Sequence, residues 1–212
     1  MSSATRTILV TGFEPFGGES VNSSWEAARK LDGWRVGEFA VVALLLPCAY
    51  DASVKELIQA IEALRPEAVL MAGQAARRGV VCVERFARNL DDAPAPNNLG
   101  VARTAAAISA GAPERLEAAA PVEAIADAIR EAGIPARVSR SAGGFVCNHL
   151  YFGALQYLRD KRSATAAVFV HLPATPRQTA PAASARRLTA AEAAKALRIA
   201  ATAMIDVRAK AA

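Results

Sequence analysis

Three side chains of the sequence could together supply a thiol nucleophile, its base and a carboxylate that orients the base. Cys147 follows a strand-like segment and the turn at residues 141–144, and it stands near the start of a helical pattern. Glycines permit the sharp turn, the helix N-terminus favours a thiolate, and N–H groups of the first helical turn can hold an oxyanion. The alternative for Cys147 is a small buried apolar side chain, a common role of free cysteine.

A thiol nucleophile needs a base, and the sequence offers two histidines. His149 lies two residues after Cys147, so on a helix the two side chains would point about 200° apart. We therefore expect His149 to pack in the structure or to face solvent. His171 follows the apolar run at 166–170, and the ends of strands present functional groups in α/β sheets. The alternative for His171 is a hydrogen-bonded histidine of the core.

Glu84 is the single carboxylate in the mostly apolar run 80–86, where Arg85 points to the opposite face. A buried carboxylate needs a partner. That partner is either the imidazole of His171, which Glu84 would orient, or an arginine such as Arg88 in a salt bridge. The residues alone leave both possibilities open.

The glycine-containing segment 11–18 follows the first predicted strand and has neither a dinucleotide-binding nor a phosphate-loop spacing. Its two aromatic residues, Phe13 and Phe16, suit the wall of an apolar ring pocket, and the alternative is ordinary loop packing. Cys48 follows a proline at the end of another predicted strand. It is either a small buried residue or a neighbour of the same pocket.

Strands and helices alternate along the chain, and they must position these side chains. Continuous apolar runs predict strands that are covered on both faces, and alternating runs predict strands with one wetter face. The continuous runs are 7–10, 39–46, 68–72 and 166–170; the alternating ones are 80–86 and 136–139. Helical patterns cover 23–33, 54–64, 121–133, 150–158 and 189–205.

This order predicts an α/β fold, a three-layer α/β/α sandwich around a largely parallel, mixed sheet. With 212 residues and no linker or repeat, we expect a single domain over 1–212. Capping boxes at Ser23 and Thr189 mark two of the helix starts. Residues 91–120 lack a clear period and predict a long loop beside the active site, and the alanine-rich stretch 180–185 predicts a surface connection.

Composition argues against several classes of protein. The net charge of +5 comes from scattered basic residues without interleaved aromatics, so we expect no nucleic-acid partner. The longest apolar run, 39–46, is too short to span a bilayer, and no secretion signal precedes it, so we expect a cytoplasmic protein without a membrane partner. Three cysteines argue against a disulfide framework, and two histidines without a Cys-x-x-Cys pair predict no metal and no other cofactor.

From about residue 8 to about residue 203 the chain resembles the pyroglutamyl peptidase I (pyrrolidone-carboxylate peptidase) family of cysteine peptidases. The stretches that carry the resemblance are 11–18 with 22–27, 73–75, 84–89, 141–151 and 170–173. The resemblance implies that Cys147 is the nucleophile, His171 the base and Glu84 the orienting carboxylate. It also implies a pocket for the pyroglutamyl lactam ring, formed by Phe13, Phe16, Phe145 and Val146, with Gln74 as a polar residue beside it.

The resemblance further implies an α/β/α sandwich, no metal, a homo-oligomer (a tetramer or a dimer), and peptides with N-terminal pyroglutamate as substrates. The sequence departs from the family at Pro94, Ala95 and Asn97, where the family has Arg, Ile and Asp, and at 76–78, where a glycine-rich stretch has become Ala-Arg-Arg. These departures motivate two alternatives. One is a diverged amidase or hydrolase with the same triad and another acyl substrate, and the other is a non-catalytic protein that binds a small ligand.

Overall fold

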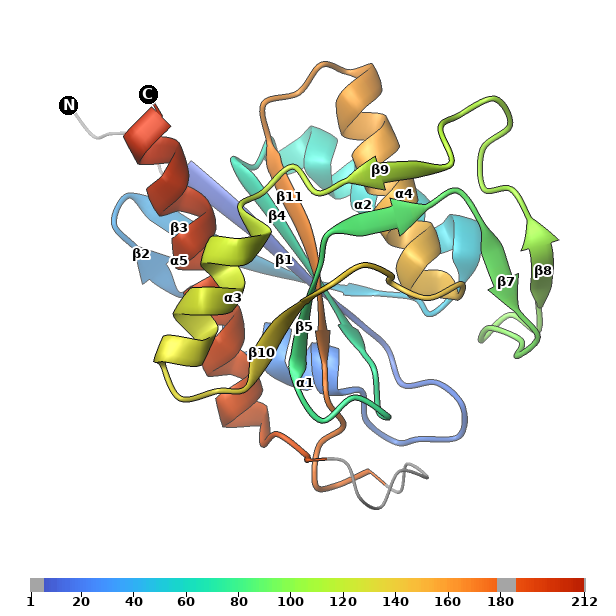
Figure 1. The fold of residues 1–212 in the computed structure, drawn as a ribbon, viewed down its shortest axis with the longest axis horizontal. Helices are drawn as coiled ribbons and strands as arrows, with labels where there is room; N and C mark the ends of the chain where they lie inside the picture. Colours follow the sequence, from blue (N-terminus) through green and yellow to red (C-terminus); the bar gives the residue numbers. More distant parts are fainter. Residues whose placement is uncertain (1–5, 179–185, 212) are drawn as a thin grey trace.

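A central seven-stranded sheet organises the molecule (Figure 1). The computed structural model describes residues 6–178 and 186–211, so the predicted surface connection at 180–185 lies outside the described residues. The strand order is β10-β5-β11-β4-β1-β3-β2. The bounds are β1 Arg6–Phe13, β2 Arg35–Val36, β3 Phe39–Leu46, β4 Ala68–Gln74, β5 Val81–Glu84, β10 Ala136–Ser139 and β11 Ala166–Leu172.

The sheet is mixed, as predicted, because two of its pairings are antiparallel. Strands β3, β1, β4 and β11 run parallel to one another, and β10 runs parallel to β5. The β5–β11 and β2–β3 pairings are antiparallel. The carboxyl ends of β1, β4 and β11 therefore meet at one edge of the sheet, and β5 passes beside β11 in the opposite direction.

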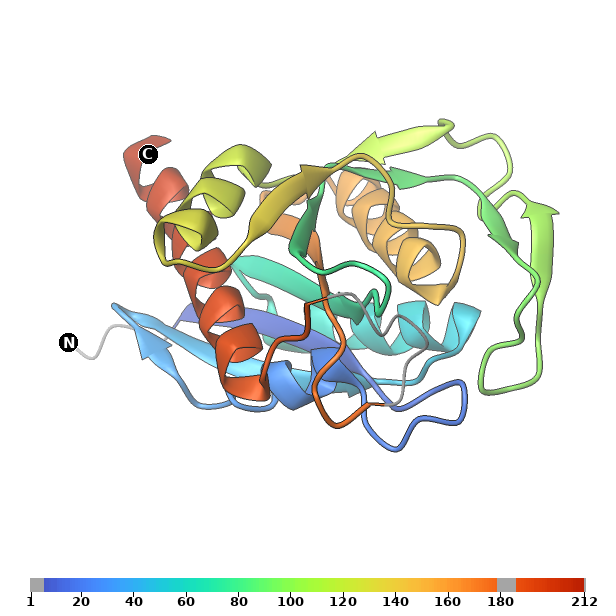
Figure 2. The ribbon, with the colours of Figure 1, turned by 60° about the horizontal axis from the view of Figure 1, so that its bottom comes forward.

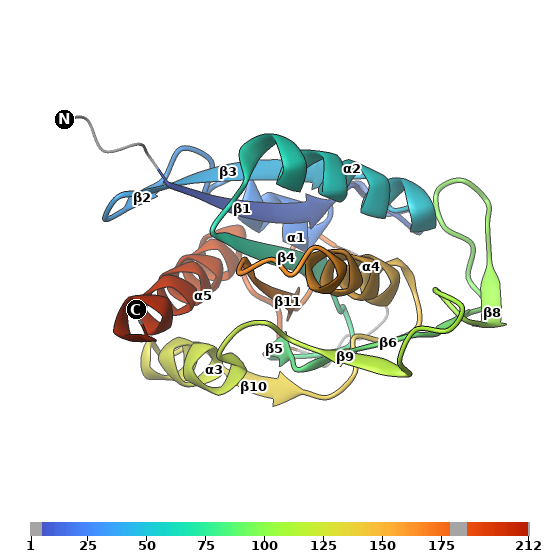
Figure 3. The ribbon, with the colours of Figure 1, turned by 90° about the horizontal axis from the view of Figure 1, so that it is seen from above.

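Helices cover both faces of this sheet and complete the three layers (Figure 3). Helices α2 (Tyr50–Leu64) and α4 (Val146–Asp160) pack against one face, around a cluster that includes Leu57, Leu150 and Phe169. Helices α1 (Ser23–Ala28), α3 (Val122–Glu131) and α5 (Ala190–Ala211) pack against the other face. None of the described helices is both long and apolar enough to span a membrane.

The two predicted capping boxes have different outcomes. Helix α5 begins as predicted, because the backbone N–H of Thr189 donates to the Glu192 carboxylate and the Glu192 N–H donates to the Thr189 hydroxyl. The prediction at Ser23 is wrong by one residue: Asn22 is the N-cap of α1, and its side-chain oxygen accepts from the Ser24 N–H. Helix α1 also ends at Ala28, before the predicted stop at residue 33.

Two strands have burial patterns opposite to the predicted ones. Strand β3 was expected to be covered on both faces, but its exposure varies along its length and Leu45 is 41% exposed. It lies next to the edge of the sheet, where only the short β2 covers it. Strand β5 was expected to have a wetter face, but all four residues are buried; on one face helix α3 covers Val81 and Val83, which belong to the same core cluster.

The long loop expected at 91–120 contains three short strands. Strands β7 (Asp91–Ala93) and β8 (Arg103–Ala106) form a two-stranded arm beside the main sheet (Figure 2), and β9 (Arg115–Glu117) pairs with β6 (Phe86–Arg88). The arm is attached to the segment that follows β1, because the Asn98 amide donates to the Glu14 carboxylate and to the carbonyl of Pro15. Residues 91–120 therefore form ordered short strands and not a structureless loop.

Gly12 lets helix α1 approach strand β1 unusually closely. A Cβ at this position would lie 2.7 Å from the backbone N and Cα of Trp25 and 2.8 Å from the carbonyl carbon of Ser24. Real Cβ atoms do not tolerate such contacts with backbone. The hydroxyl of Ser24 also accepts from the N–H of Phe13, which fixes the end of β1 against the start of α1.

We expect Gly12→Ala to lower the free energy of unfolding by about 2 kcal/mol or more, because the added methyl must push helix backbone away from a packed strand. Denaturant unfolding followed by circular dichroism measures the change. An unaltered midpoint would show that α1 shifts without cost and that this close approach does not stabilise the fold.

Candidate active site

A pocket of about 220 Å³ opens where the carboxyl ends of β1, β4 and β11 meet the start of helix α4. Most of the side chains singled out from the sequence face it. Its lining comprises Phe13, Phe16, Asn22, Cys48, Gln74, Ala75, Arg78, Ala142, Gly143, Phe145, Cys147 and His171. Segments that are far apart in the sequence thus contribute to one cavity.

Cys147 is the second residue of α4 and is half-buried. No side chain caps this helix, so N–H groups of its first turn remain available at the pocket. Burial raises the pKa of the Cys147 thiol, and the neighbouring Cys48 and Glu84 act in the same direction. The guanidinium of Arg78 and the backbone N–H of Cys147 lower this pKa, but burial prevails. The thiol is therefore protonated at neutral pH.

Gly73 places the sulfur of Cys147 beside His171. A Cβ on Gly73 would lie 2.9 Å from Cys147 Sγ and 2.6 Å from the ring of Phe169, so only glycine leaves room for both. Gly73 is also the register partner of His171 across the parallel β4–β11 pair. Side chains at paired positions project from the same face of a sheet. The thiol and the imidazole are therefore neighbours on the α4 side of the sheet.

The antiparallel direction of β5 brings Glu84 to the same imidazole. Glu84 pairs in register with Phe169, two residues before His171, and diagonal neighbours on one face lie within reach of long side chains. His171 Nδ1 is 2.8 Å from Glu84 Oε1, and both side chains are buried. The His171 ring packs on Phe169 with centroids 4.8 Å apart. These contacts fix one imidazole nitrogen and leave Nε2 without a hydrogen-bond partner among the described residues.

Arg78 lines the pocket, and the sequence interpretation missed it as a partner of Glu84. Its Nη1 lies 2.6 Å from the same Glu84 Oε1, and its Nη2 donates to the carbonyl of Ser141 at 3.0 Å. The two partners considered for Glu84, an imidazole and an arginine, are thus present together, although the arginine is not Arg88. A buried carboxylate needs positive charge nearby, and this need was the one sequence feature that pointed to an arginine beside Glu84. The sequence does not show which of the nearby arginines lies there.

The apolar wall of the pocket contains three of the predicted phenylalanines. Phe16 and Phe145 have ring centroids 6.0 Å apart, and Phe13 lies at the end of β1. Val146 is fully buried in the core and is not among the lining residues, unlike the other predicted pocket residues. Gln74 lines the pocket, but its Oε1 already accepts from the Ser23 N–H and from Gln178.

The second histidine is buried in a separate, partly exposed cluster, which fits the first of its two expected roles, packing in the structure or facing solvent. His149 Nδ1 is 2.9 Å from the Asp91 carboxylate and its Nε2 is 3.3 Å from that of Asp51. Arg103 binds both carboxylates. This cluster joins the arm to helices α2 and α4.

Cys48 fits both earlier interpretations, a small buried residue and a neighbour of the pocket, because it is 3% exposed and also lines the pocket. Burial raises the pKa of its thiol to about 12.

A protonated thiol, an imidazole held by a carboxylate and free N–H groups are the components of acyl transfer through a thioester. The imidazole can take the thiol proton as the sulfur attacks a carbonyl, and the N–H groups can hold the resulting oxyanion. Among the described residues, no three His, Cys, Asp or Glu side chains converge as a metal site would require.

Comparisons with known proteins identify the family of this chain. The family model described as pyroglutamyl peptidase matches residues 6–207. A pyrrolidone-carboxylate peptidase from Chromobacterium violaceum is 47% identical over 173 residues, which cover 82% of this chain and 80% of that protein. A protein of the same name from Cupriavidus necator is 43% identical over 176 residues, covering 82% of each chain.

Solved structures extend the similarity to the fold. Pyroglutamyl peptidase I from Bacillus amyloliquefaciens superimposes with a TM-score of 0.91 at 37% identity, covering 95% of this chain and 97% of that one. The pyrrolidone carboxyl peptidase of Thermococcus litoralis gives a TM-score of 0.92 at 32% identity, covering 98% and 96%. With its α/β fold, its pocket and these similarities, the chain belongs to the pyroglutamyl peptidase family of cysteine peptidases.

Proposed function

We propose that this protein hydrolyses the amide bond after an N-terminal pyroglutamyl residue of peptides. The observation that carries the proposal is the lining of the pocket: aromatic rings and one guanidinium, with no carboxylate among the described lining residues. A free N-terminal ammonium would need a carboxylate, and the nearby Glu84 is already engaged by Arg78 and His171. A neutral lactam ring needs apolar walls and a few amide-directed hydrogen bonds.

In the proposed mechanism Cys147 is the nucleophile and His171 its base. His171 Nε2 takes the thiol proton as Sγ attacks the pyroglutamyl carbonyl, and N–H groups at the start of α4 hold the oxyanion. The imidazolium then gives that proton to the leaving amine as the carbon–nitrogen bond breaks. Water, activated by the same imidazole, hydrolyses the thioester, which releases pyroglutamate and restores the thiol.

Glu84 orients the imidazole in this mechanism and stabilises its charged form. Phe13, Phe16 and Phe145 enclose the lactam ring. Gln74 is the proposed polar contact: its Oε1 is engaged by the scaffold, and its Nε2 has no partner among the described residues and is a donor for the lactam carbonyl. Val146 supports the pocket from within the core.

The departures from the family sequence at Pro94, Ala95 and Asn97 do not alter the lining, because none of the three is among the lining residues of the pocket. Asn97 instead closes a turn, since its side-chain oxygen accepts from the N–H groups of Leu99 and Val101. The departure at 76–78 does reach the pocket, because Arg78 lines it and binds Glu84. The placement of the first three residues favours the pyroglutamyl substrate over another acyl group, because they lie outside the cavity that would hold the acyl group.

We also propose that the protein acts in the cytoplasm as a homo-oligomer, a tetramer or a dimer. Support for self-association comes from the arm, where Leu99 is 70% exposed and Val101 is 42% exposed. Large apolar side chains that gather on a surface are typical of contacts between subunits.

The substrate is tested by release of a fluorescent amine from a pyroglutamyl amide and from the matched prolyl amide. We expect cleavage of the first to exceed that of the second by about 100-fold or more, because the prolyl ring carries a charged amine, for which the pocket lining offers no carboxylate, and lacks the lactam carbonyl. Cys147→Ala should reduce the activity by about a thousandfold or more. If the folded, reduced protein cleaves neither amide, or prefers the prolyl amide, the proposed substrate is wrong. If the Cys147→Ala variant keeps its activity, the assignment of Cys147 as the nucleophile is wrong.

The raised pKa of Cys147 predicts a slow reaction of the free enzyme with iodoacetamide. Only the thiolate is alkylated, so the rate at pH 7 should be below that of a cysteine peptide and should still be rising above pH 9. The rate is measured by mass spectrometry, and Cys147→Ala supplies the background from the other cysteines. A plateau below pH 7 would mean that a thiolate–imidazolium pair already exists in the free enzyme.

Arg78 should support activity by holding Glu84 and the coil that leads to Cys147. Arg78→Gln removes the positive charge beside the buried Glu84 carboxylate, so we expect kcat/KM to fall by about tenfold or more. Arg78→Lys, which keeps the charge, should lose less activity in the same amide-cleavage assay. Equal loss of activity in both variants would show that Arg78 acts only through the shape of the site.

A further inference from the structure

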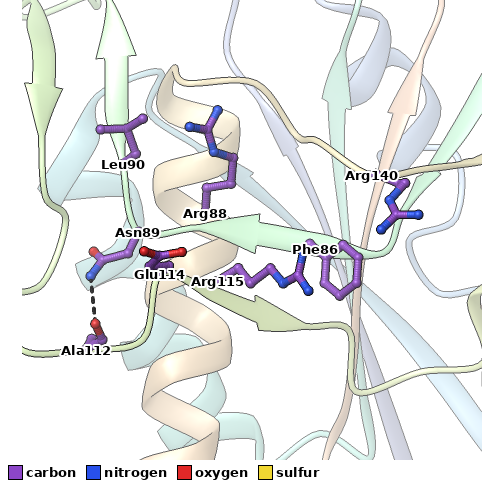
Figure 4. A pocket seen from close by; sticks show the side chains of 8 residues that line it. All are labelled: Phe86, Arg88, Asn89, Leu90, Ala112, Glu114, Arg115 and Arg140. Carbon is purple, nitrogen blue, oxygen red and sulfur yellow. Dashed lines mark hydrogen bonds between the residues drawn. The ribbon is translucent and has the colours of Figure 1, made fainter.

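A second pocket, of about 520 Å³, lies over the β6–β9 pair and shares no lining residue with the active site (Figure 4). It is bordered by the coil that runs from β10 to helix α4. Its lining comprises Phe86, Arg88, Asn89, Leu90, Ala112, Glu114, Arg115 and Arg140. Three guanidinium groups and one carboxylate thus line a single cavity.

The arrangement of two of these arginines is unfavourable without a ligand. Arg88 and Arg115 are register partners in the antiparallel β6–β9 pair. Side chains directly opposite each other in such a pair are close, and like charges at these positions destabilise it. A pair of cations in this position is expected where an anion bridges them.

No carboxylate relieves this repulsion within the described part of the chain. Arg88, Arg115 and Arg140 have no ion pair within 4.0 Å in that part of the chain. Arg85, the residue immediately before β6, pairs with Glu117 and Glu123. The carboxylates of Glu117 and Glu123 are thus directed to the arginine outside the pocket, and Glu114, which lines it, makes no ion pair within 4.0 Å with a described residue. The three guanidinium groups inside the pocket are exposed and donate to no other described residue.

An aromatic ring holds two of the three guanidinium groups in place. Arg115 Cζ lies 4.5 Å and Arg140 Cζ 5.9 Å from the centroid of the Phe86 ring, and in Figure 4 the ring lies between the two side chains. Stacking on a ring face leaves the edge of a guanidinium free for hydrogen bonds. It also limits the freedom that the side chain would lose on binding a ligand.

The backbone beneath the pocket is fixed as well. The side chain of Asn148 is fully buried; it accepts from the Arg88 N–H and donates to the carbonyls of Arg88 and Leu90. Strand β6 is therefore tied to the first turn of α4, and the position of Arg88 Cα is set by buried contacts. The site has preorganised walls and three free cationic donors.

We propose that this pocket binds a doubly charged oxyanion, with phosphate as the ligand group, between Arg88 and Arg115 and with Arg140 as a third donor. Guanidinium groups match phosphate oxygens through paired hydrogen bonds. Arg115 and Arg140 already lie against the Phe86 ring. The ligand is therefore recognised by its charge and not by stacking on this ring. Inorganic phosphate and a small phosphate ester present the same group.

Isothermal titration calorimetry with inorganic phosphate, in chloride buffer at constant ionic strength, tests the site. We expect saturable binding to the wild-type protein, a loss of affinity of at least tenfold in Arg115→Gln, and a larger loss in the variant that combines it with Arg88→Gln. The matched control is Arg137→Gln, which removes an exposed arginine of β10 outside the pocket and should leave binding unchanged.

Titration with glycerol 3-phosphate distinguishes the source of the ligand group: tighter binding than that of phosphate assigns the site to phosphate esters, and equal or weaker binding assigns it to the free ion. Wild-type protein without saturable binding of either compound overturns the proposal. The proposal is also overturned if the double variant, shown to be folded by circular dichroism, binds phosphate as tightly as the wild-type protein does. It is overturned as well if Arg137→Gln weakens phosphate binding as much as Arg115→Gln does, because the loss would then reflect only the change in net charge.

Discussion

The buried carboxylate of Glu84 is shared between His171 and Arg78, and the geometry of the active site follows from this shared contact. A carboxylate in a fully buried strand is costly unless positive charge and hydrogen bonds compensate for its lost hydration. One oxygen meets both the imidazole and the guanidinium, at 2.8 and 2.6 Å. Arg78 in turn binds the carbonyl of Ser141, on the coil that leads to Cys147. The charge of Glu84 thus organises the base and the approach to the nucleophile.

The direction of β5 makes this contact possible. A parallel β5 would end at the same edge as its neighbours, whereas the antiparallel strand places its last residue beside the middle of β11. Tyr151 of α4 donates to the Glu84 carbonyl, which ties the strand to the helix that carries Cys147. Sheet and helix therefore converge on one point, and the sulfur occupies the space that Gly73 leaves open.

The layers of the fold and most of the site residues could be predicted from sequence, because apolar patterns and short motifs are local features of the chain. Apolar runs and helix stripes predicted the layers, and the resemblance to the peptidase family grouped Cys147, His171 and Glu84, for each of which the residues alone left an alternative open. The direction of β5 could not be predicted, since three apolar residues and a glutamate fit either direction. The partner of Glu84 depended on that direction, and so Arg78 was missed. Asn22 replaced Ser23 as the helix cap because both residues have capping side chains and only the backbone conformation selects between them.

The contact between Glu84 and His171 spans 87 positions of the chain, and this has a consequence for biosynthesis. Contacts between distant residues form only after the intervening segments have organised, and strand pairs of this kind are slow to form. During translation the carboxylate leaves the ribosome long before the imidazole does. The proposed base therefore has no orienting partner in the nascent chain, and a peptidase of this design acquires its activity only after most of its sheet has assembled.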